Sequence, residues 1–278
     1  MSKIIDLHTH TTASDGSMSP GELVRYAKSR GLAAVAVTDH DTVDGLEEAL
    51  SEGEKAGIEV IPGVEISVDF EPEMHMLGYF PCKTFAKIAG VLNELRKNRE
   101  ERNPRIVKKL NEMGFNLTMD EVKKEAKGKV VGRPHIARVM VEKGYVNSIE
   151  EAFEKYLADG RPAYFKKGKL TPEQGIQEIL KAEGIPVLAH PKYLYMDMAS
   201  LDVLLKDLKA KGLKGIEAYY VDNTPEETEE FLRLADKHGL IVTGGSDFHG
   251  SYKSRIEIGV GYGNLKVPYE LLDNLRCI

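Results

Sequence analysis

Two histidines near the start of the chain have the spacing of a pair of metal ligands. His8 and His10 follow residues 4–7, a short run rich in isoleucine and leucine that is typical of a buried strand. Side chains two residues apart in a strand point to the same face, so we expect both imidazoles on one side. Asp15, in the loop that follows, adds a carboxylate that could fold back over the same spot. Mixed imidazole and carboxylate ligands suit Mn, Fe or Zn, and the spacing does not choose among them.

Six of the eight histidines fall within or directly after an expected strand, and three carboxylates accompany them in the same segments. The set is His8, His10, His40, His75, His190, His249, Asp15, Glu65 and Asp247. In a β/α barrel the carboxyl ends of the strands meet on one face, so these side chains would converge. An ordinary structural role could explain any single member but not the whole set, which predicts a site for several metal ions. His238, which precedes Gly239 at an expected helix end, fits better as a cation at the helix dipole.

Strands and helices alternate in the first 80 residues and again from residue 171 onward. Ser19-Pro20 has the pattern of a capped helix start, and residues 32–37 form a continuous apolar strand. This alternation is typical of an α/β fold with parallel strand pairing. Residues 84–156 instead carry charged amphipathic patterns interrupted by glycine and proline, which predict an insert of several helices.

Composition narrows the class of protein. With 42% hydrophobic residues the 278-residue chain can bury a large core, and no run of about 18 apolar residues predicts a transmembrane helix. An expected strand begins at residue 4, which leaves no room for a signal peptide. Two distant cysteines, Cys82 and Cys277, favour a reduced, cytoplasmic protein. The net charge of −6 argues against a surface for long nucleic acid but permits a small phosphorylated substrate.

Taken together, the motifs resemble those of the PHP (polymerase and histidinol phosphatase) phosphoesterases. The residues that carry the resemblance are His8-Thr9-His10, Asp15-Gly16, Thr38-Asp39-His40-Asp41, Glu65, His75, Ala189-His190-Pro191 and Ser246-Asp247-Phe248-His249. The resemblance implies an α/β fold, a distorted (β/α)7 barrel with an inserted small helical subdomain. We expect residues 1–97 and 171–278 to form the two parts of the barrel. Residues 98–170 would form a cap that binds substrate.

The resemblance also implies two to three divalent metal ions and assigns ligands to three positions. The three sets are His8, His10, Glu65 and Asp247; Glu65, His75 and His190; and Asp15, His40 and His249. Glu65 would bridge two metals, and Asp39 would orient a ligand. Three such cations, their three carboxylates and a bridging hydroxide leave a charge of about +2, which matches a phosphate monoester dianion.

The insert resembles the subgroup that acts on 3′,5′-nucleoside bisphosphates, whose relatives also trim the 5′ ends of short RNA. The similar stretches are residues 132–138, 153–157 and 164–167. A substrate with two phosphates needs fixed cations for the phosphate that the metals do not hold. Arg133, Lys166 and Lys167 would supply them, and His135 could donate to a phosphate or to the leaving oxygen. Arg133 could equally be a helix-start residue beside Pro134, and adjacent lysines in a loop are usually solvated.

These expectations combine into a metal-dependent phosphoesterase. It would hydrolyse the 3′-phosphate of a nucleoside 3′,5′-bisphosphate through attack by the bridging hydroxide, giving the 5′-monophosphate and phosphate. Asp247, His249 and His135 are the expected catalytic residues, with His249 or a metal-bound water as candidate proton donor. Three alternatives stay open: a 5′-to-3′ exoribonuclease on short RNA, a histidinol-phosphate phosphatase, and a non-catalytic metal-binding module. The base preference and the oligomeric state are also open.

Overall fold

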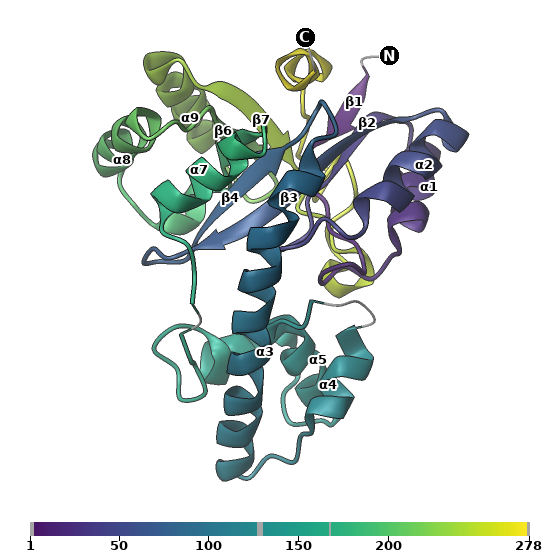
Figure 1. Cartoon of the computed structure of the whole chain (residues 1–278), viewed down its shortest axis with the longest axis vertical. Coiled ribbons are helices and arrows are strands. Elements are labelled where there is room, and N and C mark those ends of the chain that lie inside the picture. Colours follow the sequence, from purple (N-terminus) through teal and green to yellow (C-terminus); the bar gives the residue numbers. More distant parts are fainter. Residues whose placement is uncertain (1–2, 127–129, 167, 277–278) are drawn as a thin grey trace.

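The computed structural model describes residues 3–126, 130–166 and 168–276 (Figure 1). Within these ranges seven strands form one sheet in the order of the sequence. They are β1 (Ile4–Asp6), β2 (Leu32–Val37), β3 (Glu59–Val68), β4 (Met74–Tyr79), β5 (Ile185–Leu188), β6 (Gly215–Tyr220) and β7 (Ile241–Gly245). The Leu7 N–H donates to the Gly244 carbonyl at 3.1 Å, and the Asp247 N–H donates to the His8 carbonyl at 2.9 Å. The first and last strands therefore meet, and the sheet nearly closes into the expected barrel.

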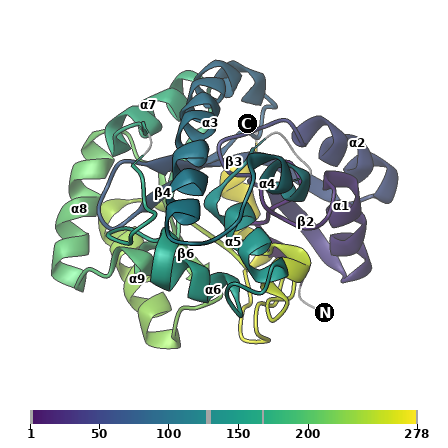
Figure 2. The same cartoon turned by 90° about the horizontal axis from the view of Figure 1, so that it is seen from below.

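Helices surround this barrel and extend beyond it. They are α1 (Pro20–Ser29), α2 (Leu46–Ala56), α3 (Ala89–Glu112), α4 (Met119–Ala126), α5 (Arg133–Glu142), α6 (Ile149–Ala152), α7 (Pro172–Lys181), α8 (Met198–Ala210) and α9 (Pro225–His238). Figure 2 shows α1, α2, α7, α8 and α9 arranged around the outside of the sheet. The helix start predicted at Ser19-Pro20 is confirmed, because the Ser19 side chain accepts the Glu22 N–H in a capping box.

One strand departs from the parallel pairing that the alternation predicts. β4 runs antiparallel to both β3 and β5, whereas the other pairs are parallel. The link between β3 and β4, residues 69–73, is too short for the crossover that parallel strands need. The prediction of parallel pairing is therefore wrong for this strand. The amino end of β4 lies at the rim where the other strands end, and His75, its second residue, lies there with it.

The two faces of the sheet bury different side chains. Ala34 and Ala36 of β2 belong to the cluster inside the barrel, while Val35 and Val37 pack outward against the surrounding helices. The small inner residues of β2 leave room for the larger inner side chains of other strands, such as Tyr79. This alternation fixes the strand register, and the register fixes which residues reach the rim.

The helical region after β4 has a hydrophobic cluster of its own, which includes Ile106, Leu110, Ile136 and Met140. In Figure 1, α4, α5 and the far end of α3 project from one end of the barrel. α3 belongs to both parts, because Leu92 and Leu95 lie in the barrel cluster. The expected boundary between residues 97 and 98 falls inside this helix. The division into the ranges 1–97, 98–170 and 171–278 otherwise remains a prediction.

No helix in the described ranges is long and apolar enough to cross a membrane. Cys82 is disulfide-bonded rather than free, contrary to the expectation of reduced cysteines. Cys277 lies outside the described residues.

Candidate metal centre

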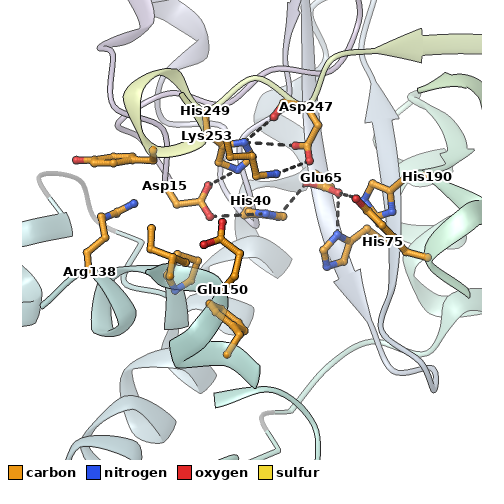
Figure 3. Close-up of a pocket in the computed structure, with 15 residues that line it drawn as sticks. Asp15, His40, Glu65, His75, Arg138, Glu150, His190, Asp247, His249 and Lys253 are labelled. Carbon is orange, nitrogen blue, oxygen red and sulfur yellow. Dashed lines mark hydrogen bonds and ion pairs between the residues drawn. The ribbon is translucent and has the colours of Figure 1, made fainter. Parts of the chain in front are cut away.

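The nine predicted ligands converge at one end of the barrel. They come from the loops after β1, β2, β5 and β7, from β3, and from the amino end of β4, and Figure 3 shows seven of them around one cavity. None of their side chains is more than 18% exposed. The rings of His10 and His249 stack with their centroids 4.1 Å apart, and His40 lies 4.7 Å from His10. A reversed β4 is essential here, because it places His75 at this end.

Glu65 lies at the middle of the cluster. Its Oε1 is 2.7 Å from His75 Nδ1 and 2.9 Å from His190 Nε2. Its Oε2 is 3.0 Å from His40 Nδ1 and 3.3 Å from Nε2 of both His8 and His10. Each carboxylate oxygen thus faces a different group of imidazoles, which is the placement that a bridging carboxylate needs.

The other two carboxylates complete the surroundings of the His10 ring. Asp15 Oδ1 is 3.3 Å from His249 Nε2, and Asp15 Oδ2 is 3.9 Å from His40 Nε2. Asp247 Oδ1 is 3.1 Å from His10 Nε2 and 3.5 Å from His249 Nδ1. The predicted third set, Asp15 with two histidines, is therefore together in space.

Several buried ligand atoms have no hydrogen-bond partner, and this is the test of whether metals fit. They are His8 Nε2, His10 Nδ1, His10 Nε2, His40 Nδ1 and Glu65 Oε2. Buried polar atoms in proteins are nearly always satisfied, so such a group calls for an added ligand. Three sets have ligand atoms within 4.8 Å of one another: His10, Asp15, His40 and His249; His8, His10 and Glu65; and His40, Glu65 and His75. The residues present fit divalent metals.

The carboxylates of this centre are ionised in the metal-free protein. Burial alone would raise the pKa of Glu65, but the neighbouring histidines, His40 first among them, hold it well below its usual value. Burial would likewise raise the pKa of Asp15, and His40 and His249 lower it well below the ordinary value. Both carboxylates are thus ready to bind a cation without losing a proton.

The histidines of the centre differ in the direction of their pKa shifts. Burial lowers the pKa of His40 to about 3, so its ring is neutral. Burial also lowers the pKa of His10, but the nearby carboxylates of Asp247 and Glu65 outweigh it and raise the pKa to about 9. The same balance against Glu65 raises the pKa of His75 to about 9. Without metal, His10 and His75 carry protons that a bound metal ion would displace.

Glu217, a residue that the sequence analysis missed, orients two of the histidines. Its side chain is fully buried, and it accepts from His8 Nδ1 at 2.9 Å and from the His190 N–H at 2.8 Å. This hydrogen bond fixes the tautomer of His8 so that Nε2 faces the cluster. A signal was available, because Glu217 is the one charged residue in the otherwise apolar strand β6.

Two buried aspartates hold the loops that carry ligands. Asp39, which we expected to orient a ligand, accepts from the Thr11 N–H at 2.8 Å and from the Ser14 hydroxyl at 2.5 Å. These bonds fix the loop next to Asp15. Asp6 accepts from the Ser246 N–H at 2.9 Å and so fixes the residue before Asp247. Asp6 was missed from the sequence, although it is the polar member of the apolar run at residues 4–7.

The expected substrate contacts lie apart from the metal cavity. Arg133 Nη2 is 2.7 Å from Glu73 Oε2, and Lys169 Nζ is 2.7 Å from Glu73 Oε1. The Arg133 guanidinium lies over the rings of Phe153 and Tyr164, at 5.6 Å and 5.5 Å from their centroids. We call these five residues the cation pocket. They line a cavity of about 200 Å³. Lys169 was missed, since its sequence context resembles that of a solvated lysine.

The other three predicted substrate contacts are Lys166, Lys167 and His135, and each has a different outcome. Lys166 is 57% exposed and pairs with Asp69 at 2.9 Å, and it lines the same 200 Å³ cavity. Lys167 lies outside the described residues. His135 is buried, its Nδ1 accepts the Gly132 N–H at 2.9 Å, and burial lowers its pKa to about 4. The structure does not place the His135 side chain on the wall of the metal cavity.

The metal cavity has a volume of about 290 Å³. Its walls combine seven of the predicted metal ligands from the barrel with side chains from α5, α6 and the loop after β7. The latter include Arg138, Glu150, Tyr252 and Lys253 (Figure 3). The helical insert therefore forms one wall of the cavity.

Comparison with known proteins agrees with this geometry. Residues 6–181 match the model of the PHP domain. The chain is 37% identical over 250 residues to the 5′-3′ exoribonuclease of Haemophilus influenzae, covering 90% of this chain and 91% of the relative. It is 32% identical over 257 residues to the 3′,5′-nucleoside bisphosphate phosphatase of Chromobacterium violaceum, covering 92% and 90%. A structure assigned as a metal-dependent phosphoesterase, from Bifidobacterium adolescentis, superposes with a TM-score of 0.87 at 30% identity, covering 98% of this chain and 95% of that chain.

Fold, ligand cluster and relatives define a class, the metal-dependent hydrolases of phosphate esters. Within that class, the chain belongs to the PHP domain family. The prediction of an enzyme is confirmed, and the alternative of a non-catalytic module loses its support.

Proposed function

We propose that this enzyme hydrolyses the 3′-phosphate of nucleoside 3′,5′-bisphosphates, releasing the 5′-monophosphate and inorganic phosphate. The observation that carries the proposal is the position of Glu73. Its Oε1 is 3.8 Å from Nε2 of His75 in the metal centre, and the same carboxylate pairs with Arg133 and Lys169 of the cation pocket. A second phosphate bound by Arg133 and Lys169 would thus lie one side chain away from the predicted metals.

The chemistry of the cation pocket suits a phosphate group. Arg133 offers a guanidinium fork that can hold two phosphate oxygens, and Lys169 adds a point charge beside it. In the structure the Glu73 carboxylate pairs with both Arg133 and Lys169. A phosphate would therefore bind to these two cations by displacing Glu73. Lys166, Lys167 and His135 remain proposed contacts of this second phosphate or of the leaving oxygen.

At the metal centre the protein side chains provide fixed positions. Two to three divalent ions (Mn, Fe or Zn) would supply an activated water nucleophile and positive charge at the phosphoryl oxygens. Glu65 would hold two of them together, and Glu217 keeps His8 Nε2 directed at them. The Asp247 carbonyl accepts the Nδ1 hydrogen of His249 at 2.8 Å, leaving Nε2 to face Asp15. This favours His249 as a ligand rather than as the proton donor.

A second candidate is the removal of nucleotides from the 5′ end of short RNA. One observation favours it: the metal cavity shares Arg138, Ile149, Glu150, Tyr193, Tyr252 and Lys253 with a neighbouring groove of about 910 Å³. This groove would accommodate a chain longer than one nucleotide. The relative from Haemophilus influenzae carries this activity in its name.

The deciding experiment compares substrates on the manganese-loaded protein. Adenosine 3′,5′-bisphosphate and adenosine 3′-monophosphate share the scissile group and differ only in the 5′-phosphate. We expect kcat/KM for the bisphosphate to be at least tenfold higher, about 1.4 kcal/mol. Equal values would reject the second phosphate site. Histidinol phosphate and a short 5′-phosphorylated RNA complete the series, and the RNA sample is assayed for released mononucleotides as well as phosphate.

A further inference from the structure

Lys253 has no part in the predicted ligand set, yet it lies at the metal centre. It ends the 3₁₀ turn at Gly250–Lys253, which follows β7. Its Nζ is 2.6 Å from Asp247 Oδ2, and its side chain is 40% exposed. Figure 3 shows Lys253 beside His249 and Asp15, on the wall of the metal cavity.

The two oxygens of Asp247 have separate surroundings. Oδ2 accepts hydrogen bonds from Lys253 Nζ and from the Tyr220 hydroxyl, the latter at 2.9 Å. Oδ1 faces the imidazoles, at 3.1 Å from His10 Nε2 and 3.6 Å from His8 Nε2. Lys253 and Tyr220 therefore leave one oxygen, Oδ1, for a metal ion.

The positive charge of Lys253 is directed at the cavity. Among the described residues that line it, Arg138 and Lys253 are the only arginine or lysine side chains. Arg138 is already engaged, since it pairs with Glu125 at 2.9 Å and stacks on the Tyr252 ring at 3.6 Å. An ammonium group has three N–H donors, and Asp247 takes one of the Lys253 donors. Two donors remain beside the predicted metals.

We propose that Lys253 binds a non-bridging oxygen of the scissile phosphate while it keeps hold of Asp247. The site would accept the phosphoryl group of any ester that reaches the metals, monoester or diester. A compact cation fixed beside that group complements the charge that develops on its oxygens during displacement. The inference needs only a phosphate ester as substrate, and not the preference for bisphosphates proposed above.

The test measures metal content and phosphate binding separately. The variants are Lys253→Met, Lys253→Arg and Tyr220→Phe, each loaded with manganese. The matched control is Lys237→Met, which removes a surface lysine paired with Asp202 at 2.7 Å. Elemental analysis gives the bound metal, and calorimetry with inorganic phosphate gives the dissociation constant of that ion.

We expect Lys253→Met to retain its metal, to bind phosphate about tenfold more weakly and to lose about 100-fold in kcat. Lys253→Arg should recover part of both losses, and Lys237→Met should match the wild type. Tyr220→Phe should leave phosphate binding unchanged, because it removes only a support of Asp247.

Two results would overturn the proposal. Unchanged phosphate affinity in Lys253→Met would show that the ammonium does not touch the phosphate. Loss of metal in that variant would reduce Lys253 to a positioning residue for Asp247. Because inorganic phosphate is the probe, a failed preference for bisphosphates would leave this test intact.

Discussion

The metal centre and the cation pocket are neighbours, and they differ in how their charges are satisfied. The metal centre leaves five buried ligand atoms without a hydrogen-bond partner. In the cation pocket Arg133 and Lys169 are already paired with Glu73. The centre is therefore completed by adding an ion, whereas the pocket can bind an anion only by giving up a partner. One site is preorganised for its ligand, and the other requires an exchange.

The largest expected effect comes from removing Glu65, the carboxylate that we expect to bridge two metal ions. Glu65→Ala leaves two groups of imidazoles without their common carboxylate, so kcat should fall by at least ~1,000-fold, about 4 kcal/mol in barrier. Bound metal should fall as well, as elemental analysis would show. Glu229→Ala, at an exposed position of α9, is the control. Near-normal turnover in Glu65→Ala would disprove the bridging role.

Substitution of Glu217 tests how far the preorganisation of the centre depends on the hydrogen bonds of this residue to His8 and His190. Glu217→Ala removes the acceptor that orients His8 and the one that fixes the backbone of His190. Loss of such an outer partner typically weakens metal binding about 10- to 100-fold, and we expect a loss of that size. A manganese titration measures it, with Glu217→Gln as the milder comparison. Wild-type affinity in the alanine variant would mean that packing alone holds the imidazoles.

The metal centre should make the stability of the metal-free protein fall as the pH rises from 6.5 to 9. The folded-state pKa values of His10 and His75 are raised to about 9, above the ordinary 6.5. The contribution of these two histidines to stability is thus complete below about pH 6.5 and is lost as the pH rises through about 9, with a loss on the order of 5 kcal/mol for the two together between pH 6.5 and pH 9.

Urea unfolding in the presence of a chelator, at pH 6.5 and pH 9, measures this loss. The metal-loaded protein is the control and should not lose stability over the same interval, because metal has replaced the protons. Equal pH slopes with and without metal would contradict the assignment of the slope to His10 and His75.

In the cation pocket, Arg133→Met should act on one substrate only. The KM for adenosine 3′,5′-bisphosphate should rise about tenfold, since one charge-assisted phosphate contact is lost. The KM for adenosine 3′-monophosphate should not change. Equal effects on both substrates would place Arg133 in the support of the cavity rather than in contact with a second phosphate.

The smallest effect should come from the carboxylate that occupies the pocket. Glu73→Gln keeps the shape and weakens the hold on Arg133 and Lys169, so the bisphosphate KM should fall about threefold, or ~0.6 kcal/mol. Steady-state kinetics with both adenosine substrates measures the change. A higher KM for the bisphosphate would show that Glu73 supports these cations instead of competing with the phosphate.

The metal centre and the cation pocket also differ in how much of each could be predicted from the sequence. The ligands of the metal centre follow strands directly, and strand ends meet at a fixed place in a barrel, so local patterns predict their convergence. The reversal of β4 was missed because the alternation of strands and helices says nothing about direction. The short link at residues 69–73 did contain that information.

The cation pocket could not be predicted in this way. Glu73 and Arg133 are sixty positions apart in the sequence, and their contact depends on how the insert packs against the barrel. Lys169 and Lys253 resemble ordinary solvated lysines, so nothing local distinguishes them. Glu217 and Asp6 could have been found, because a lone acid in a buried strand must have hydrogen-bond partners.

The reversal of β4 has a mechanical consequence. Because β4 runs antiparallel to its neighbours, it ends far from the rim that carries the predicted ligands. The chain must return to that rim before the insert begins, and α3 spans this distance. Its 24 residues span about 36 Å. On the way Arg99 Nε donates to Asp41, next to His40, at 2.9 Å. α3 therefore carries the insert, and the Arg99–Asp41 contact holds the middle of this helix beside the metal centre. A tilt of the insert over a substrate would move Asp41, the neighbour of His40.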